Sequence, residues 1–92
     1  MAVRYTWNPS KRRINIERHG GIDFTTVYEF DWETAKVAPD ERFDYGEYRY
    51  VAYGLIGRHL HAMVFTYCGG AVQVISLRKA NRREVRVYEE EA

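Results

Sequence analysis

Two strand-like runs joined by a pair of glycines constrain the fold of this chain more than any other feature. Residues 58–68 and 71–78 are rich in β-branched and aromatic side chains, which favour strands. Gly69-Gly70 lies between them, and both glycines tolerate the positive φ that a two-residue hairpin turn requires. We therefore expect an antiparallel hairpin, part of a meander that forms most of the sheet.

The same turn predicts which residues oppose one another. Directly opposed residues of an antiparallel pair share one face of the sheet, and a one-residue slip would separate them. We therefore expect His61 and Arg78 to lie side by side at the open end of the hairpin. Counting back from the turn gives the opposed pairs Cys68–Ala71, Phe65–Val74, Met63–Ser76 and His61–Arg78.

The rest of the pattern predicts a single domain over residues 1–92. Further strands are expected at 3–7, 33–37 and 47–55, with a loop at 39–46. Asn8 is expected to cap a helix that starts at Pro9 and continues over 11–19. Asp23 caps a short second helix, and Asn81 caps a third that runs to residue 90. The order β-α-α-β-β-β-β-α is that of an α+β fold, an antiparallel sheet with helices packed on it.

Composition narrows the class of protein. Cys68 is the single cysteine, which excludes an internal disulfide and a metal site built on several thiolates. No apolar run approaches membrane-spanning length, and the first five residues show no signal-peptide core. We therefore expect a protein of the reducing cytoplasm with no membrane segment.

Charge is distributed unevenly along the chain, although the net charge is only +1. Basic residues dominate 1–22 and 78–86, whereas 23–47 carries eight acids against two bases. The two basic segments could form one polyanion-binding face, or they could be solvated surfaces that pair with the acidic middle. The arginines in the first turn of the last helix oppose its dipole, which favours a role with a phosphate or an acidic partner.

Three blocks of residues, spread over nearly the whole chain, carry more specific information. The first is Trp7-Asn8-Pro9-Ser10-Lys11 with Asn15 and Arg18-His19-Gly20. The second runs from Asp40 to Arg49, with Glu47 and Arg49 at its end. The third comprises Gly57-Arg58, the run from Val74 to Ala80, Arg83-Glu84 and Tyr88.

These ordered blocks resemble the BrnT toxin family within the RelE-like group. The resemblance implies a RelE-like α+β fold and a metal-independent endoribonuclease that needs no cofactor and inhibits translation and growth. It also implies an RNA substrate and a cognate BrnA-like antitoxin with a ribbon-helix-helix DNA-binding domain, which neutralises the toxin in a hetero-oligomer.

RNA cleavage without a metal uses the 2′-OH of the substrate as nucleophile. The enzyme must accept its proton, stabilise a dianionic phosphate and protonate the leaving 5′ oxygen. Arg58 and Arg78 are the expected phosphate clamps because a guanidinium matches phosphate oxygens with a planar fork. For Arg78 the third block favours this role, whereas for Arg58 a surface salt bridge is equally consistent.

Candidates for proton transfer are less specific. Glu47 and Arg49 lie two apart on a predicted strand and so share a face, where Glu47 is a general base, an orienting group or a plain ion-pair partner. His61 has the right pKa range, although a histidine in an apolar strand is more often a packed residue. Tyr88 could stack on a base or donate a proton, but packing against the sheet is more common.

A last set of residues is expected to support RNA binding. Glu84 is expected to hold Arg78 or Arg58 in place. His19 is expected to bind RNA, although it could equally bond to free carbonyls at the end of its helix. The expected RNA-binding residues are Lys11, His19, Lys79, Arg82 and Arg83.

Two other hypotheses remain open. The first is a catalytically inactive toxin-fold module that binds an antitoxin or RNA. It remains an alternative because Leu77 and Val85 depart from the family pattern. A small DNA-binding regulator is a weaker alternative, since the sequence lacks a helix-turn-helix pattern and its basic helical segments lie far apart.

Overall fold

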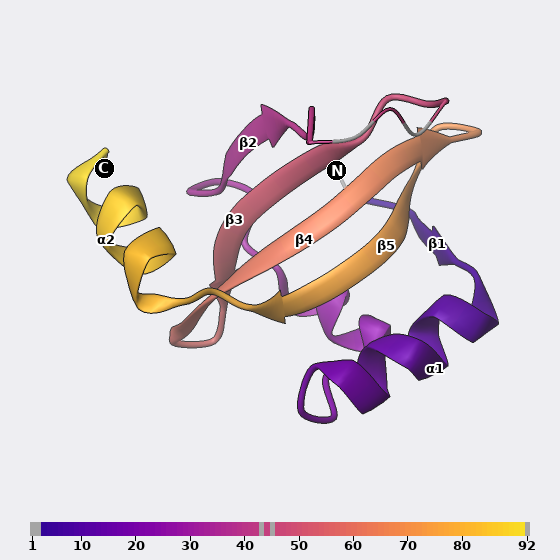
Figure 1. Ribbon diagram of the computed structural model, residues 1–92, viewed down its shortest axis with the longest axis horizontal. Helices are drawn as coiled ribbons and strands as arrows, with labels where there is room; N and C mark the ends of the chain where they lie inside the picture. The colour runs from indigo at the N-terminus through magenta and orange to yellow at the C-terminus, as the bar shows by residue number, and fades with distance from the viewer. Residues whose placement is uncertain (1–2, 43, 45, 92) are drawn as a thin grey trace.

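The computed structural model describes residues 3–42, 44 and 46–91, and over these residues the chain forms a five-stranded sheet (Figure 1). The strands are β1 (Tyr5–Trp7), β2 (Lys36–Pro39), β3 (Tyr50–Ile56), β4 (His59–Cys68) and β5 (Ala71–Lys79), in the spatial order β1-β5-β4-β3-β2. Neighbours from β2 to β5 are antiparallel, and β1 joins β5 in parallel. The sheet is therefore mixed, within an α+β architecture consistent with the RelE-like fold.

The helices are α1 (Pro9–Arg18), the 3₁₀ helix η1 (Phe24–Glu29) and α2 (Arg82–Glu90). The predicted caps are confirmed, because the side chains of Asn8, Asp23 and Asn81 each accept backbone N–H groups at the start of their helices. Across the part of the chain that the structure describes, no helix has the length and apolar character needed to cross a bilayer.

The second strand begins later than the sequence pattern predicted. Asp31 accepts hydrogen bonds from the Glu33 amide at 3.0 Å and from the Thr34 hydroxyl at 2.9 Å. This local turn occupies the residues where a strand was expected from 33, so β2 starts at Lys36. The strand extends to Pro39, which lies on the edge of the sheet, where a proline is tolerated. The expected loop thus begins one residue later, and residues 43 and 45 within it lie outside the described residues.

The hairpin turn is confirmed, but the predicted register holds only near it. Gly69 and Gly70 have φ values of 57° and 79°, and the pairs Cys68–Ala71 and Phe65–Val74 form as expected. Beyond them a β-bulge adds Ile75 to β5, because Val64 pairs with Ser76 while Phe65 pairs with Val74.

This one extra residue changes every later pair. Met63 faces Leu77 rather than Ser76, His61 faces Lys79, and Arg78 faces Ala62. The predicted pairs Met63–Ser76 and His61–Arg78 are therefore wrong. Because side chains alternate along a strand, the bulge places Arg78 and His61 on opposite faces of the sheet.

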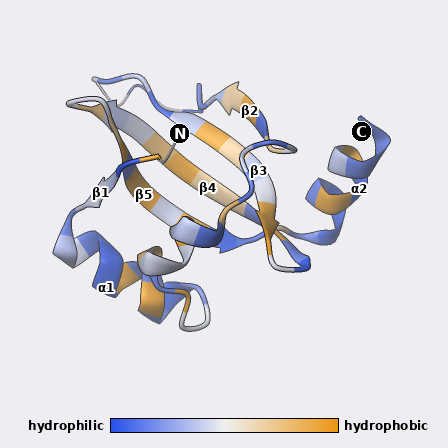
Figure 2. Ribbon diagram, turned by 180° about the vertical axis from the view of Figure 1, so that it is seen from behind, coloured by the Kyte–Doolittle hydropathy of each residue, from blue (hydrophilic) through white to orange (hydrophobic). Residues whose placement is uncertain are grey.

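The core lies on the face of the sheet that η1 covers (Figure 2). Phe24 and Val27 of η1 are fully buried, as are Met63 and Phe65 of β4. Leu77 of β5 is also fully buried, so the residue that departs from the family pattern is a core residue here. Aromatic rings fill the remaining space, with Trp32 meeting Phe65 edge-on at a centroid distance of 5.5 Å.

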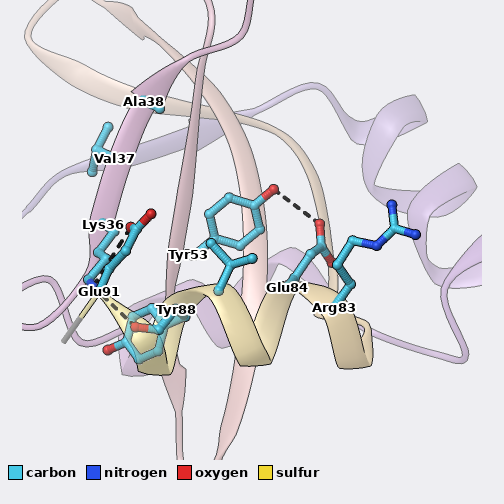
Figure 3. A pocket seen from close by; sticks show the side chains of 9 residues that line it. Lys36, Val37, Ala38, Tyr53, Arg83, Glu84, Tyr88 and Glu91 are labelled. Atoms are coloured by element: carbon cyan, nitrogen blue, oxygen red, sulfur yellow. Dashed lines mark hydrogen bonds and ion pairs between the residues drawn. The ribbon is translucent and has the colours of Figure 1, made fainter.

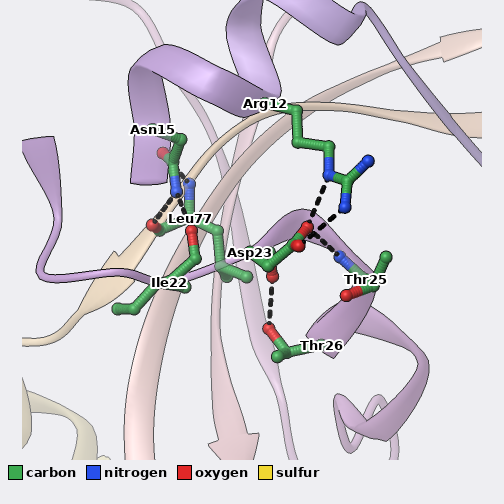
Figure 4. Close-up of polar contacts among 7 residues, drawn as sticks. All are labelled: Arg12, Asn15, Ile22, Asp23, Thr25, Thr26 and Leu77. Carbon is green, nitrogen blue, oxygen red and sulfur yellow. Dashed lines mark hydrogen bonds and ion pairs between the residues drawn. The ribbon is translucent and has the colours of Figure 1, made fainter. Parts of the chain in front are cut away.

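Asn15 fixes α1 along the free part of β5 (Figure 4). β1 covers β5 only from Val72 to Val74, so the groups beyond need other partners. The Asn15 amide nitrogen donates to the Leu77 carbonyl at 2.8 Å and the Ile22 carbonyl at 3.1 Å, and its oxygen accepts from the Leu77 amide at 3.0 Å. The side chain therefore takes the place of a neighbouring strand and holds the basic helix beside β5.

Candidate functional site

A row of side chains crosses four strands on the face opposite the core. Lys36 of β2 pairs with Tyr53 of β3, Tyr53 with Ala62 of β4, and Ala62 with Arg78 of β5. Opposed residues share a face, so these four side chains stand in one line although they come from distant parts of the sequence. We call this line the cross-strand row.

Helix α2 attaches to the cross-strand row through polar groups. Glu84 bonds to Arg78 and Tyr53, while the Tyr88 carbonyl accepts from the Lys36 ammonium at 3.1 Å and Glu91 lies 3.9 Å from it. No residue of α2 is fully buried, and these polar contacts connect the helix to the row. The helix therefore reaches from one end of the row to the other.

Glu84 accepts hydrogen bonds through both of its carboxylate oxygens. Its Oε1 accepts from Arg78 Nη1 at 2.7 Å and the Asn81 amide at 2.9 Å, and its Oε2 accepts from Arg78 Nη2 at 2.8 Å and the Tyr53 hydroxyl at 3.0 Å. The bonds from Arg78 are the largest cause that lowers the pKa of Glu84 to about 2. A carboxylate so engaged is a poor proton acceptor. Of the two arginines that the sequence named as its partners, Glu84 contacts Arg78, and its supporting role in catalysis stays a prediction.

Arg78 keeps one edge of its guanidinium available. Glu84 occupies the end formed by Nη1 and Nη2, and Nη1 also approaches the Lys79 carbonyl at 3.4 Å. Within the described residues no acceptor bonds to Nε, so the side-on edge of Nε and Nη2 remains for a ligand. The Arg78 side chain is 35% exposed, and hydrogen bonding to Glu84 raises its pKa. The geometry presents a fixed cation with an open two-donor edge, which suits a phosphate.

Tyr53 and Arg42 complete the charged cluster, and neither was predicted from the sequence as a site residue. Burial, followed by the bond to Glu84, raises the pKa of the Tyr53 hydroxyl, so it stays protonated. The charge of Arg42 lowers the pKa of both Tyr53 and Arg78, which places it near them, and Arg42 itself binds the buried Asp40 at 2.8 Å. The sequence does contain a clue to Tyr53, because it follows Glu47 and Arg49 at an even spacing. A strand that ran through all three residues would place their side chains on one face.

A pocket of about 370 Å³ lies beside this cluster, between β2 and α2 (Figure 3). Tyr53, Val87 and Tyr88 provide its aromatic and apolar walls. Lys36, Arg83, Glu84 and Glu91 provide its charged groups. We call it the β2–α2 pocket.

A second pocket, of about 450 Å³, brings other predicted residues together. Arg58 lies exposed in the turn between β3 and β4 and lines this pocket with Lys79 and Tyr88. The Tyr88 hydroxyl donates to the Thr34 carbonyl at 2.8 Å, so in this structure the phenol anchors α2. Arg58 is thus near the end of α2 but outside the Arg78–Glu84 network.

Several of the predicted basic residues line adjoining hollows beside Arg78. Lys11 and His19 line a hollow of about 280 Å³ between α1 and β5. His19, Arg78 and Lys79 line an adjoining hollow of about 290 Å³. Three of the expected RNA-binding residues therefore form a basic track that leads to Arg78. The other two, Arg83 and Arg82, lie on α2, where Arg83 lines the β2–α2 pocket and Arg82 is exposed.

Two predicted proton-transfer candidates lie apart from Arg78. Glu47 accepts a hydrogen bond from Arg49 at 3.2 Å just before β3, at the opposite end of that strand from Arg58. His61 is on the core face, 6% exposed, with Nδ1 2.8 Å from the His59 carbonyl, and burial lowers its pKa. Catalytic roles for these residues stay predictions, and the geometry does not bring them to the open edge of Arg78.

A comparison with known protein families identifies a match over most of the chain. A family model described as "Ribonuclease toxin, BrnT, of type II toxin-antitoxin system" matches residues 7–84. The matched segment contains the cross-strand row and Glu84, and it ends before Tyr88. No curated protein matches the chain.

Proposed function

The chain belongs to the BrnT family of ribonuclease toxins of type II toxin–antitoxin systems, and from this premise we propose that it is a metal-independent endoribonuclease whose reaction centre is Arg78. The observation that carries the proposal is the pairing of the Arg78 guanidinium with the Glu84 carboxylate. Glu84 fixes Arg78 through one edge, and the other edge is open toward a ligand. Preorganised cations of this kind stabilise the charge that develops on a phosphate in the transition state.

The proposed reaction is transesterification by the RNA itself. The 2′ oxygen attacks the neighbouring phosphorus, and the bond from phosphorus to the 5′ oxygen breaks. The proton of the 2′-OH passes to a base, and the departing 5′ oxygen gains a proton. The products are a 2′,3′-cyclic phosphate and a 5′-hydroxyl. Arg78 binds the phosphate oxygens, and the nearby charge of Arg42 adds to the positive potential.

The basic track supports binding of a longer RNA strand. Lys11, His19 and Lys79 lie in adjoining hollows next to Arg78, and Arg58 lines the pocket that Lys79 also lines. Basic side chains in such a series can bind successive phosphates of a single strand. We propose that these residues, with Arg82 and Arg83, hold the substrate on either side of the cut.

A toxin of a type II system has an antitoxin partner. We propose that this partner is BrnA-like, with a ribbon-helix-helix DNA-binding domain, and that it neutralises the toxin in a hetero-oligomer in the cytoplasm. The proposal is supported by family membership and by the exposed position of α2 beside the site.

The test is inducible expression of the wild type beside Arg78→Ala, with Arg13→Ala as the matched control, because Arg13 is an exposed arginine of α1 that lines none of the pockets described above. Wild type and Arg13→Ala should arrest growth and fragment cellular RNA. Arg78→Ala, at equal soluble level, should do neither. Intact RNA and normal growth with all three proteins would contradict the proposal and leave a toxin-fold interaction module instead.

A further inference from the structure

We propose that the β2–α2 pocket binds one nucleobase of the RNA, next to the phosphate held by Arg78. The inference rests on the proposed ribonuclease function and adds to it a base-reading site. Such a site makes cleavage depend on the identity of a nucleotide beside the cut.

The lining of the pocket fits a flat, uncharged ring. Tyr53, Val87 and Tyr88 present aromatic and apolar surface, on which a nucleobase can stack or pack. Small-molecule sites begin at roughly 300 Å³, so a pocket of about 370 Å³ takes one small ring system rather than an extended ligand.

Charge distinguishes a base from a phosphate as the occupant. Glu84 and Glu91 both line the pocket, and Glu84 is held ionised by Arg78, which lowers its pKa to about 2. Lys36 and Arg83 also line the pocket, so its two cations and two carboxylates balance. A phosphate therefore favours the open edge of Arg78 and the basic track outside, whereas a neutral base needs no net charge in the pocket.

The pocket adjoins Arg78 through Glu84. Glu84 forms part of the pocket wall and also holds Arg78, at 2.7 and 2.8 Å, while Tyr53 bonds to the same carboxylate at 3.0 Å. A phosphate on Arg78 and a base against Tyr53 are thus separated by a single side chain. One nucleotide, or two adjacent ones, can occupy both positions.

The rim of the pocket supplies the polar groups that distinguish bases. Lys36 is a donor, and Glu91, with a side chain 63% exposed, is an acceptor 3.9 Å away (Figure 3). The edges of the four bases differ in their order of donors and acceptors, so an adjacent lysine and carboxylate favour some edges over others. We therefore expect base selection in addition to stacking.

The experiment uses short RNAs that carry each of the four bases, or an abasic ribose, at each position flanking the wild-type cut. Wild type should cleave the best base about tenfold or more faster, in kcat/KM, than the abasic RNA at one flanking position. Val87→Trp, which fills the pocket, should reduce that ratio to near one. Val3→Trp is the matched control, since Val3 is also an exposed valine but lies in the N-terminal segment, and it should keep the wild-type ratio.

Glu91→Gln provides a second measurement that does not depend on a bulky substitution. Replacing the acceptor should change the order of base preference at the same position. A ratio near one for the wild type at every position, or unchanged ratios and preference in Val87→Trp and Glu91→Gln, would overturn the pocket while leaving the ribonuclease intact. A wild type that cleaves none of these RNAs overturns the proposed function, and the base pocket with it.

Discussion

Asn15 and Glu84 show how much of this small molecule depends on single polar side chains. The Asn15 amide bonds to both backbone groups of Leu77 and to the Ile22 carbonyl. Glu84 accepts from Arg78, Tyr53 and the Asn81 amide. Removing such a group leaves several partners unsatisfied at once, which costs more than the removal of one exposed hydrogen bond.

Asn15→Ala should lower the free energy of unfolding by about 2–6 kcal/mol, because the Leu77 amide and carbonyl lose their partner in a buried position, at roughly 1–3 kcal/mol each. Asn8→Ala is the matched control and should cost about 1 kcal/mol, the usual value for an N-cap. Urea unfolding of both variants measures the difference. Equal losses would show that Asn15 does not serve as the neighbour of β5.

The stability of the protein should fall in acid partly through Glu84. Its pKa is lowered from 4.5 to about 2, chiefly by Arg78, so its stabilising contribution is present above pH 4.5 and is lost as the pH falls toward 2. Glu84→Gln should be less stable than wild type at neutral pH, and this difference should shrink across that window. Asp23, with its pKa also lowered to about 2 by Arg12, remains in both proteins. Thermal melts from pH 7 to 3 test this, and a constant difference would contradict it.

Among the elements, β3 and the segment after η1 pack closely at Gly54. A methyl group built on Gly54 would overlap the Phe30 ring, and the neighbouring backbone is paired through Phe30 with Ile56 and through the Asp31 amide with the Leu55 carbonyl at 2.9 Å. The absent side chain is therefore what allows the ring to lie against the strand.

Gly54→Ala should lower the free energy of unfolding by about 1–3 kcal/mol through overpacking. Adding Phe30→Leu should recover part of that loss, so the double variant is more stable than the sum of the two single effects predicts. Chemical denaturation of the four proteins gives the coupling. Strict additivity would mean that the two residues do not clash.

The sequence predicted elements whose signals are local. Asn8, Asp23 and Asn81 cap helices, and Gly69-Gly70 turns the hairpin, because each property belongs to those residues alone. The bulge could not be predicted in the same way, since Ile75 is an ordinary strand former and nothing local marks it as the extra residue. The predicted His61–Arg78 pair was wrong for this reason.

At the scale of the whole molecule, the site is assembled from parts that are far apart in sequence. Arg78 and Glu84 could be predicted, because the third sequence block contains both. Lys36 and Tyr53 could not, because their place in the cross-strand row depends on the register of four strands and on α2 lying over that row. A local sequence pattern reveals neither the register of the strands nor the position of α2.

The basic track should contribute to RNA affinity in a salt-dependent way. A double Lys11→Ala, Lys79→Ala variant should bind a non-cleavable 2′-deoxy strand more weakly than wild type. The slope of log affinity against log salt should fall by roughly 0.7 for each phosphate that the variant no longer neutralises. Binding titrations from low to high salt measure this, with Arg13→Ala as a control that also removes a basic side chain. An unchanged slope would place the RNA elsewhere on the surface.

The central claim is that Arg78, held by Glu84, stabilises the phosphate during metal-independent cleavage. Purified wild type and Arg78→Lys, shown to be folded by thermal melting, should be compared on one RNA in the presence of EDTA, with the ends of the products identified. We predict that wild type cleaves to a 2′,3′-cyclic phosphate and a 5′-hydroxyl, and that Arg78→Lys, which keeps the charge but loses the fork, is slower by about a hundredfold or more. Equal rates for the two proteins, or loss of wild-type cleavage in EDTA, would contradict the claim.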